Sequence, residues 1–449
     1  MENNLHVEIV SRENIKPSSP TPPNLKTFNL SLFDQRAPPV YTTLVLFYQI
    51  SSSTDHSLNN NIIITTLKKS LSEALTSYVP LAGKIDNINN SNIVECTDEG
   101  AIFIEAKSNT ILSTFLEENP NEDRLLERLL PAKTRSAEAA TSPLLLVQVT
   151  LFECGGLAIG LCMSHKLADA ATLCMFLKNW SNPGQRFTLT VPKKFDISPE
   201  SIWFPLPRDQ RNNNNNNNIE SLMIKTVNKR YVFDKTKIDV LKSKASSERV
   251  KNPTRVEVVS ALVWKCAINA SSKLMINSLN SNNKYYSFLS QLVNVRDKVK
   301  PIQENTSGNL VGSYVVHVEY NNKEELELKN LVFKMRKAIK EYSNNNGEKQ
   351  GRWCREVVEL IKGIDDDMNN NMIFLCNSWC NFGFYEVNFG WGKPIWAWRP
   401  SSSIENVLKL MDTKNGGVEV SLTLSKENMA LFERDPHILA FANPSHSII

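Results

Sequence analysis

A histidine and an aspartate four residues apart are the side chains of this sequence best suited to acid–base chemistry. They stand in the segment Ser164-His165-Lys166-Leu167-Ala168-Asp169. An imidazole has an unperturbed pKa of about 6.5, so His165 could remove the proton of an alcohol near neutral pH. General-base catalysis of this kind is typically worth ~10²–10⁴-fold in rate. Taken alone, the spacing more often belongs to a structural histidine followed by a helix-capping aspartate.

Two nucleophilic side chains near the histidine, Cys162 and Ser164, suggest a second kind of chemistry. A thiol or hydroxyl activated by a neighbouring base can form a covalent acyl-enzyme. Consecutive residues of an extended chain point to opposite faces, however, which separates Ser164 from His165. Direct proton removal by His165 is therefore the favoured mechanism, and the covalent route remains an alternative.

The elements expected around His165 would present it at a tight turn. Residues 157–163 are apolar and β-favouring, which indicates a buried strand just before the histidine. A helix is expected after the turn, with Asp169 at its N-cap position. The apolar face of that helix would consist of Leu173, Phe176, Leu177 and Trp180. A connection between a strand and a helix can direct a side chain into a cleft.

Both halves of the sequence mix helices and strands. Residues 64–78 have helical spacing and end before Pro80, and residues 144–152 form an apolar run typical of a strand. In the second half, residues 255–267 favour a helix and residues 418–424 alternate as a strand does. The pattern predicts a mixed α/β (α+β) fold.

Asparagine-rich patches punctuate the chain and are typical of exposed loops. The run Asn212 to Asn218 is the strongest linker signal, and it follows Phe204-Pro205-Leu206-Pro207. We therefore expect an N-terminal domain over residues 1–200, a crossover linker over 201–224 and a C-terminal domain over 225–449.

The net charge and the lengths of the apolar runs narrow the possible partners and the cellular compartment. The 449 residues carry a formal net charge of only +4, which argues against nucleic-acid binding. The first residues lack the basic start and apolar core of a signal peptide, and no apolar run approaches the ~18 residues needed to cross a bilayer. We expect a cytoplasmic monomer with neither a membrane nor a nucleic-acid partner.

Cysteine spacing gives no sign of a metal site. The eight cysteines include no CxxC pair, and no histidine pair accompanies Cys376 and Cys380. Reduced cysteines that mainly fill the core are the expected outcome, with no metal cofactor.

A second motif, Asn388-Phe389-Gly390-Trp391-Gly392, links the sequence to a known family. Together with His-x-x-x-Asp it resembles the plant BAHD acyltransferases, although their second motif begins with aspartate. The resemblance runs from about Ile15 to Thr413 and is closest to the branch that includes vinorine synthase and salutaridinol acetyltransferase. Other agreeing segments are Tyr78 to Gly83, Phe152 to Gly156, Thr254 to Glu257, Val293 to Arg296, Ser378 to Cys380 and Gly383 to Glu386.

The resemblance implies a fold and an activity. It implies two domains similar to chloramphenicol acetyltransferase, each a mixed sheet flanked by helices, with a channel between them. A segment near residues 370–390 would return to the first domain's sheet. The implied reaction transfers an acyl group, by branch resemblance acetyl, from acyl-CoA to a hydroxyl of a small-molecule alcohol. The acceptor would be an alkaloid, an acylsugar or a similar specialised metabolite of plants.

The resemblance also implies roles for residues near the reacting atoms. His165 would be the general base, and Asp169 would turn away from substrate to pair with Arg296. Ser378 or Trp379 would stabilise the oxyanion, although Trp379 could equally be part of the core.

Three further residues carry open alternatives. Thr254 and Arg255 match a family position near CoA, but a helix N-cap and a solvated arginine are the plainer interpretation. Asn388 replaces the family's aspartate, which leaves open a catalytically inactive relative that binds small molecules or a partner. A peptide-synthetase condensation domain is a third, less favoured reading, because its usual second histidine and glycine are missing here.

Overall fold

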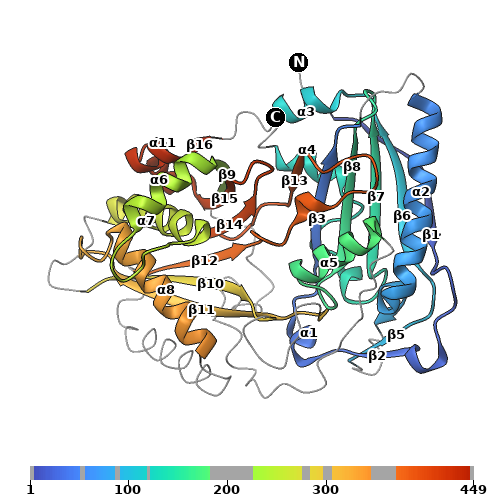
Figure 1. The fold of residues 1–449 in the computed structure, drawn as a ribbon, viewed down its shortest axis with the longest axis horizontal. Coiled ribbons are helices and arrows are strands. Elements are labelled where there is room, and N and C mark those ends of the chain that lie inside the picture. Colours follow the sequence, from blue (N-terminus) through green and yellow to red (C-terminus); the bar gives the residue numbers. More distant parts are fainter. Residues whose placement is uncertain are drawn as a thin grey trace, which may run out of the picture.

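Two sheets lie side by side in the computed structural model of the chain (Figure 1). The structure describes residues 5–50, 56–85, 92–118, 122–182, 226–275, 284–296, 306–344 and 371–444. The predicted linker, residues 201–224, lies outside these ranges.

The first sheet is buried on both faces. Its strand order is β1 (Val7–Ile15), β6 (Ala101–Ser108), β7 (Leu145–Phe152), β8 (Leu157–Ser164), β3 (Tyr41–Tyr48) and β13 (Trp396–Trp398). Helices α2 (His56–Ser77) and α5 (Ala170–Ser181) pack on one face, and α3 (Leu112–Glu118) and α4 (Asp123–Leu126) pack on the other. Burial on both faces explains why β3, β7 and β8 read as continuous apolar runs.

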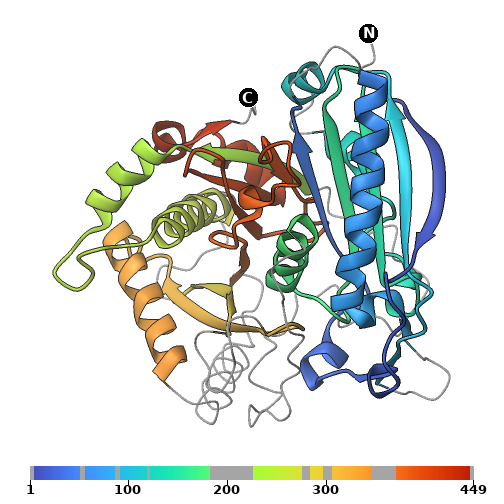
Figure 2. The ribbon, with the colours of Figure 1, turned by 45° about the vertical axis from the view of Figure 1, so that its right-hand side comes forward.

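Among the described residues, the helices that cover the second sheet lie on one face, and that face holds a large apolar core. The strand order is β11 (Val311–Glu319), β10 (Tyr286–Asn294), β12 (Met372–Ser378), β14 (Val407–Asp412), β15 (Val418–Ser425), β9 (Thr226–Phe233) and β16 (Asn443–Pro444). The covering helices are α6 (Lys235–Ala245), α7 (Arg255–Met275), α8 (Leu328–Asn344), α10 (Lys426–Phe432) and α11 (Pro436–Phe441). Figure 2 shows α5 of the first half lying next to the second half.

Smaller elements complete the described parts. A three-stranded sheet contains β2 (Thr27–Asn29), β5 (Ile93–Glu95) and β4 (Lys84–Ile85), and the short helix α1 (Leu32–Arg36) follows β2. Short 3-10 turns occur at Pro23–Leu25, Val79–Ala82, Glu127–Leu129, Ala137–Ala140 and Phe384–Glu386.

The segment that returns to the first sheet differs from the predicted one. We expected residues 370–390, but β12 pairs in parallel with β10 and β14 of the second sheet. The returning strand is β13, which pairs with β3. Between these strands the chain crosses back, and Phe384 and Val387 enter the core under α2 and α5. The motif at 388–392, which we assigned to the C-terminal domain, therefore packs against the first half.

Candidate active site

His165 stands where β8 ends and the chain turns towards α5, as its sequence predicted. Its backbone N–H donates to Val40 O at 2.9 Å, and the turn is closed by Leu167 N–H donating to Ser164 O at 3.0 Å. Asp169 caps α5 by accepting from Thr172 N–H at 2.9 Å. The strand and the helix are both buried, so the turn between them has little freedom to move.

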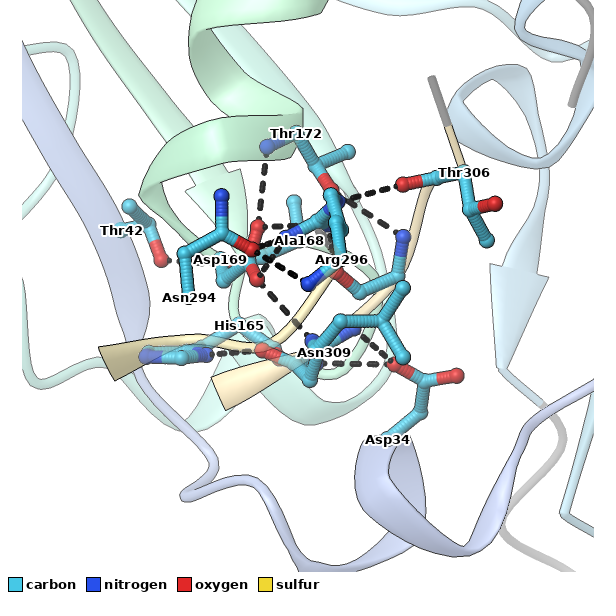
Figure 3. A network of polar contacts seen from close by, with 12 residues as sticks. Asp34, Thr42, His165, Ala168, Asp169, Thr172, Asn294, Arg296, Thr306 and Asn309 are labelled. Atoms are coloured by element: carbon cyan, nitrogen blue, oxygen red, sulfur yellow. Dashed lines mark hydrogen bonds and ion pairs between the residues drawn. The ribbon is translucent and has the colours of Figure 1, made fainter. Parts of the chain in front are cut away.

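Asn309 fixes the orientation of the His165 ring. Its side-chain NH₂ donates to His165 O at 2.6 Å and to Asp34 Oδ1 at 2.9 Å, and both of these partners act as acceptors. The amide oxygen must then face His165 Nδ1, at 2.9 Å. Because an amide oxygen can only accept, Nδ1 must carry the proton, which leaves Nε2 unprotonated in the neutral ring. Figure 3 shows this series of hydrogen bonds from Asp34 through Asn309 to His165.

Asp34, which lies on α1, anchors this series of hydrogen bonds. It forms a capping box with Ser31 and accepts from both the backbone and the side-chain N–H of Asn309. Burial raises the pKa of Asp34, and its hydrogen bonds from Ser31 and Asn309 only partly offset that effect. All four donors point at its two oxygens, so the carboxylate acts as a pure acceptor that orients the Asn309 amide.

Asp169 and Arg296 form a buried, two-bonded ion pair behind the histidine. Arg296 Nη1 lies 2.8 Å from Asp169 Oδ2, and Nη2 lies 3.0 Å from Oδ1. Each residue is 2% exposed. Two backbone N–H groups, of Thr172 and Leu310, fill the remaining positions on the carboxylate. Burial by itself raises the pKa of Asp169, but the charge of Arg296 and these hydrogen bonds lower it overall.

The guanidinium of Arg296 ties the ion pair to the chain around it. It donates to Thr306 O at 2.6 Å, to Gly308 O at 2.9 Å and to Thr172 Oγ1 at 2.9 Å. Asp169 makes no hydrogen bond to His165 among the described residues. The pair therefore holds the turn and the segment at 306–310, which carries Asn309, in one fixed arrangement.

A pocket between the two halves opens beside the His165 ring. The first half contributes both apolar and polar residues to its wall, Asp169 among them, and the second half contributes residues of β10, β11 and the end of β12. The lining includes Phe33, Ala37, Thr42, His165, Ala170, Leu292, Val293, Asn309, Val311, Asn377, Ser378, Trp379 and Phe382.

Ser378 and Trp379, the two expected oxyanion donors, both reach this pocket. The Ser378 hydroxyl accepts from Cys380 N–H at 3.3 Å. The Trp379 ring also packs with the core of the first half, and a role of its indole N–H towards the oxyanion stays a prediction. Its indole N–H has no hydrogen-bond partner among the described residues.

Thr254 and Arg255 lie at the start of α7 and are bonded within the protein. Thr254 caps the helix in a reciprocal pair with Glu257. Arg255 donates to Gly416 O at 2.9 Å and to Asn381 Oδ1 at 2.7 Å, and it pairs with Asp412 at 3.0 Å. A role of either residue towards CoA stays a prediction.

The motif at 388–392 forms a turn remote from His165. Asn388 Oδ1 accepts from the backbone N–H groups of Gly390 and Gly392, at 2.9 and 3.1 Å. Both glycines have positive φ, 107° and 120°. Phe389 packs edge-on against Trp180 and lies near Tyr48, at the end of β3 opposite the one paired with Ser164. Seven residues of strand separate those ends by on the order of 20 Å.

The nucleophiles of the covalent alternative are turned away from the pocket. Ser164 is fully buried, and its hydroxyl donates to Ala139 O at 2.5 Å. Cys162 is also fully buried, and burial raises the pKa of its thiol to about 12. A thiol at that pKa is almost entirely protonated at neutral pH and is a poor nucleophile.

The described residues offer neither a cluster of metal ligands nor a membrane-spanning helix. They contain no group of three or more His, Cys, Asp or Glu side chains arranged to hold a metal ion. None of their helices combines the length and apolar character needed to cross a bilayer.

The polar network behind His165 contains residues that sequence analysis missed. Asn309 is 144 residues from His165 and 275 from Asp34, so no local pattern joins them. The only local signal was the Ser31-x-x-Asp34 spacing of a capping box, which predicts a helix start and nothing about the site.

Comparison with known proteins identifies the class and then the family. The crystal structure of vinorine synthase superposes with a TM-score of 0.75 and 30% identity, over 98% of this chain and all of that one. The fold is thus the chloramphenicol-acetyltransferase-like one expected from the motifs. A family model described as the Transferase family matches residues 5–439, and the chain belongs to this family, the BAHD acyltransferases.

Two plant relatives of similar length are acetyltransferases by name. Stemmadenine O-acetyltransferase of Catharanthus roseus is 34% identical, with 96% of each chain covered. The limonoid 21-O-acetyltransferase of Melia azedarach is also 34% identical, with 99% of this chain and all of that one covered. The protein is accordingly an O-acyltransferase.

Proposed function

We propose that the protein transfers an acetyl group from acetyl-CoA to a hydroxyl of a plant specialised metabolite, with His165 as the general base. The observation that carries this proposal is the 2.9 Å contact between His165 Nδ1 and Asn309 Oδ1, from which the tautomer of His165 follows. Asn309 holds the proton on Nδ1, so the lone pair of Nε2 is free to accept one. His165 lines the pocket, and Nε2 has no hydrogen-bond partner among the described residues.

The reaction follows from this arrangement. The acceptor oxygen attacks the thioester carbonyl while His165 Nε2 takes its proton, and a tetrahedral oxyanion forms. Trp379 N–H or the Ser378 hydroxyl donates to that oxyanion. The intermediate collapses, the bond from carbon to sulfur breaks, and CoA thiolate takes the proton from His165. No covalent enzyme intermediate is needed, which agrees with the burial of Cys162 and Ser164.

The pocket wall favours an acceptor with an apolar body. Phe33, Leu292, Val311 and Phe382 supply apolar contacts, and the names of two relatives describe acetylation of stemmadenine and of a limonoid. A sugar ester with many free hydroxyls would leave several of them without partners there. We therefore favour an alkaloid or terpenoid alcohol over an acylsugar, and we propose a cytoplasmic monomer that needs no metal.

One experiment tests the activity. The pure protein is incubated with acetyl-CoA and a panel of alkaloid, terpenoid and acylsugar alcohols, and free thiol and product mass are followed. Acetyl ester formation with initial rates that intersect when both substrates are varied supports direct transfer. Parallel lines would point to the acyl-enzyme, and no product with any acceptor would favour the inactive relative.

A further inference from the structure

A buried arginine lies directly behind the pocket wall formed by Ser378 and Trp379. Arg399 follows β13 and is 6% exposed. Its guanidinium carbon lies 4.3 Å from the centre of the Trp379 ring, a close cation–π contact. Its Nη2 donates to Asn377 O at 2.8 Å and more weakly to Leu410 O at 3.4 Å.

These contacts meet where β12 ends at the pocket, beside its neighbouring strand β14. Ser378 pairs with Leu410 there, and Leu410 O also accepts from the backbone N–H of Trp379 at 2.8 Å. Arg399 therefore contacts Asn377 just before Ser378, Leu410 on the neighbouring strand β14, and the ring of Trp379 just after Ser378. Phe384 also packs against the Trp379 ring, with ring centres 5.6 Å apart.

The charge of Arg399 is not neutralised by an ion pair in the described residues. Its Nε has no hydrogen-bond partner there either. Burial lowers its pKa to about 9, which still leaves the guanidinium protonated at neutral pH. The nearby Glu419 is engaged by Arg230 and by the Trp396 indole N–H. A buried cation without its own carboxylate is costly to fold, and here it lies against Trp379, one of the aromatic residues that line the pocket.

We propose that Arg399 is a positioning residue for the oxyanion donor, acting through Trp379. The guanidinium holds the indole plane, draws electron density from the ring and so strengthens N–H as a donor. The inference rests on the proposed acyl transfer, and it assigns a role to a residue that carries no motif.

A double-mutant cycle between Arg399 and Trp379 tests the inference. Trp379→Phe keeps a ring and removes the N–H, and kcat should fall by about 10²-fold, the scale for losing one oxyanion donor. Arg399→Met should lower kcat about 10-fold, with KM for acetyl-CoA changed less than about threefold, because the interaction forms mainly in the transition state. In the Trp379→Phe background, Arg399→Met should cost less than about threefold, since its route of action has been removed.

Two further variants keep the test decisive. Arg399→Lys retains a cation without the planar stack and should give a kcat between the parent and Arg399→Met; it replaces Arg399→Met in the cycle if that variant does not fold. Arg336→Met is the matched control, because Arg336 pairs with Glu257 on the helix-covered side of the second sheet, and its kcat should stay at the parent value.

Fully additive losses in the cycle would overturn the inference, and so would a loss confined to KM. A parent that transfers acetyl normally while the cycle is additive rejects only the role of Arg399. A parent with neither transfer nor acetyl-CoA hydrolysis rejects the proposed function itself. Thiol release with water as the acceptor separates these results even when the natural acceptor is not in the panel.

Discussion

The two signature segments of this chain, 165–169 and 388–392, use their polar ends in opposite ways. Asp169 is buried and receives four hydrogen bonds, two from Arg296 and two from the backbone N–H groups of Thr172 and Leu310. Asn388 is exposed and receives two, both from glycines of its own turn. The first segment joins distant parts of the molecule beside the pocket, and the second shapes a local turn remote from it.

Of positions 169 and 388, only position 169 needs a charged side chain. A neutral residue in place of Asp169 would leave Arg296 buried and unpaired, because no other carboxylate among the described residues contacts it. At position 388 the partners are two neutral N–H donors, and an amide oxygen accepts from them as a carboxylate does. Substitutions in the first segment should therefore have larger effects than substitutions in the second.

The largest effect is expected at the histidine. His165→Ala should lower turnover by about 10²-fold or more while the fold stays intact. The change removes the general base but leaves no buried charge without its partner. Steady-state kinetics and thermal melting check both parts. His437→Ala is the matched control, since His437 is half-exposed and contacts Asp435 outside the pocket. Near-parent turnover in well-folded His165→Ala would rule out its role as the base.

Asp169→Ala should lower both the melting temperature and the activity. Removing one partner of a buried ion pair costs roughly 3–5 kcal/mol, and the segment carrying Asn309 would lose its support. Asp234→Ala provides the control, because Asp234 caps α6 through Lys237 N–H at 2.8 Å and bonds Thr236 instead of an arginine. Its loss should cost about 1 kcal/mol, the value of a cap alone.

The opposite pattern would change the role of Asp169. Unchanged melting with lost activity would make it a direct orienter of His165, as in a catalytic triad.

Asn309→Ala should lower kcat by about 10-fold or more with little change in KM for either substrate. The ring of His165 would lose the partner that keeps its proton on Nδ1, and a wrong tautomer cannot accept the acceptor's proton. Asn228→Ala is the control, since Asn228 bonds Ser421 and Thr423 on β15, away from the pocket lining. Unchanged kcat in Asn309→Ala would show that the ring keeps its tautomer without this amide.

Sequence patterns predicted the local parts of the site well. The strand before His165, the cap at Asp169 and the helix after it follow from apolar spacing and capping within about 25 residues, and the structure has them as β8 and α5. The pairing of Asp169 with Arg296, 127 residues apart, came only from the family resemblance. Spacing carries no information on contacts of that range.

The parts that sequence analysis missed depend on tertiary packing. Asn309 meets His165 only after two sheets have formed side by side, and nothing in its neighbours marks it. The returning strand β13 has three residues, too few for an alternating pattern to stand out. Residues 372–378 form a longer run, and they joined the second sheet instead. The missed contact of Asn309 and the misplaced returning strand both arise where long-range pairing outweighs local preference.

The smallest effect is expected at the position where this chain departs from its family. Asn388→Asp should change the melting temperature modestly and leave turnover within several-fold of the parent. The carboxylate would keep both hydrogen bonds to Gly390 and Gly392 and make them charge-assisted, a gain of ~1 kcal/mol at an exposed site. The pocket lining contains no residue of 388–392, so the reacting atoms should not sense the new charge. Asn415→Asp, in the turn between β14 and β15, controls for adding a carboxylate to an exposed turn. The informative failure is a parent inactive towards every acceptor that gains acetyl transfer through Asn388→Asp alone. That result would place the essential charge in the second segment and make the native chain an inactive relative.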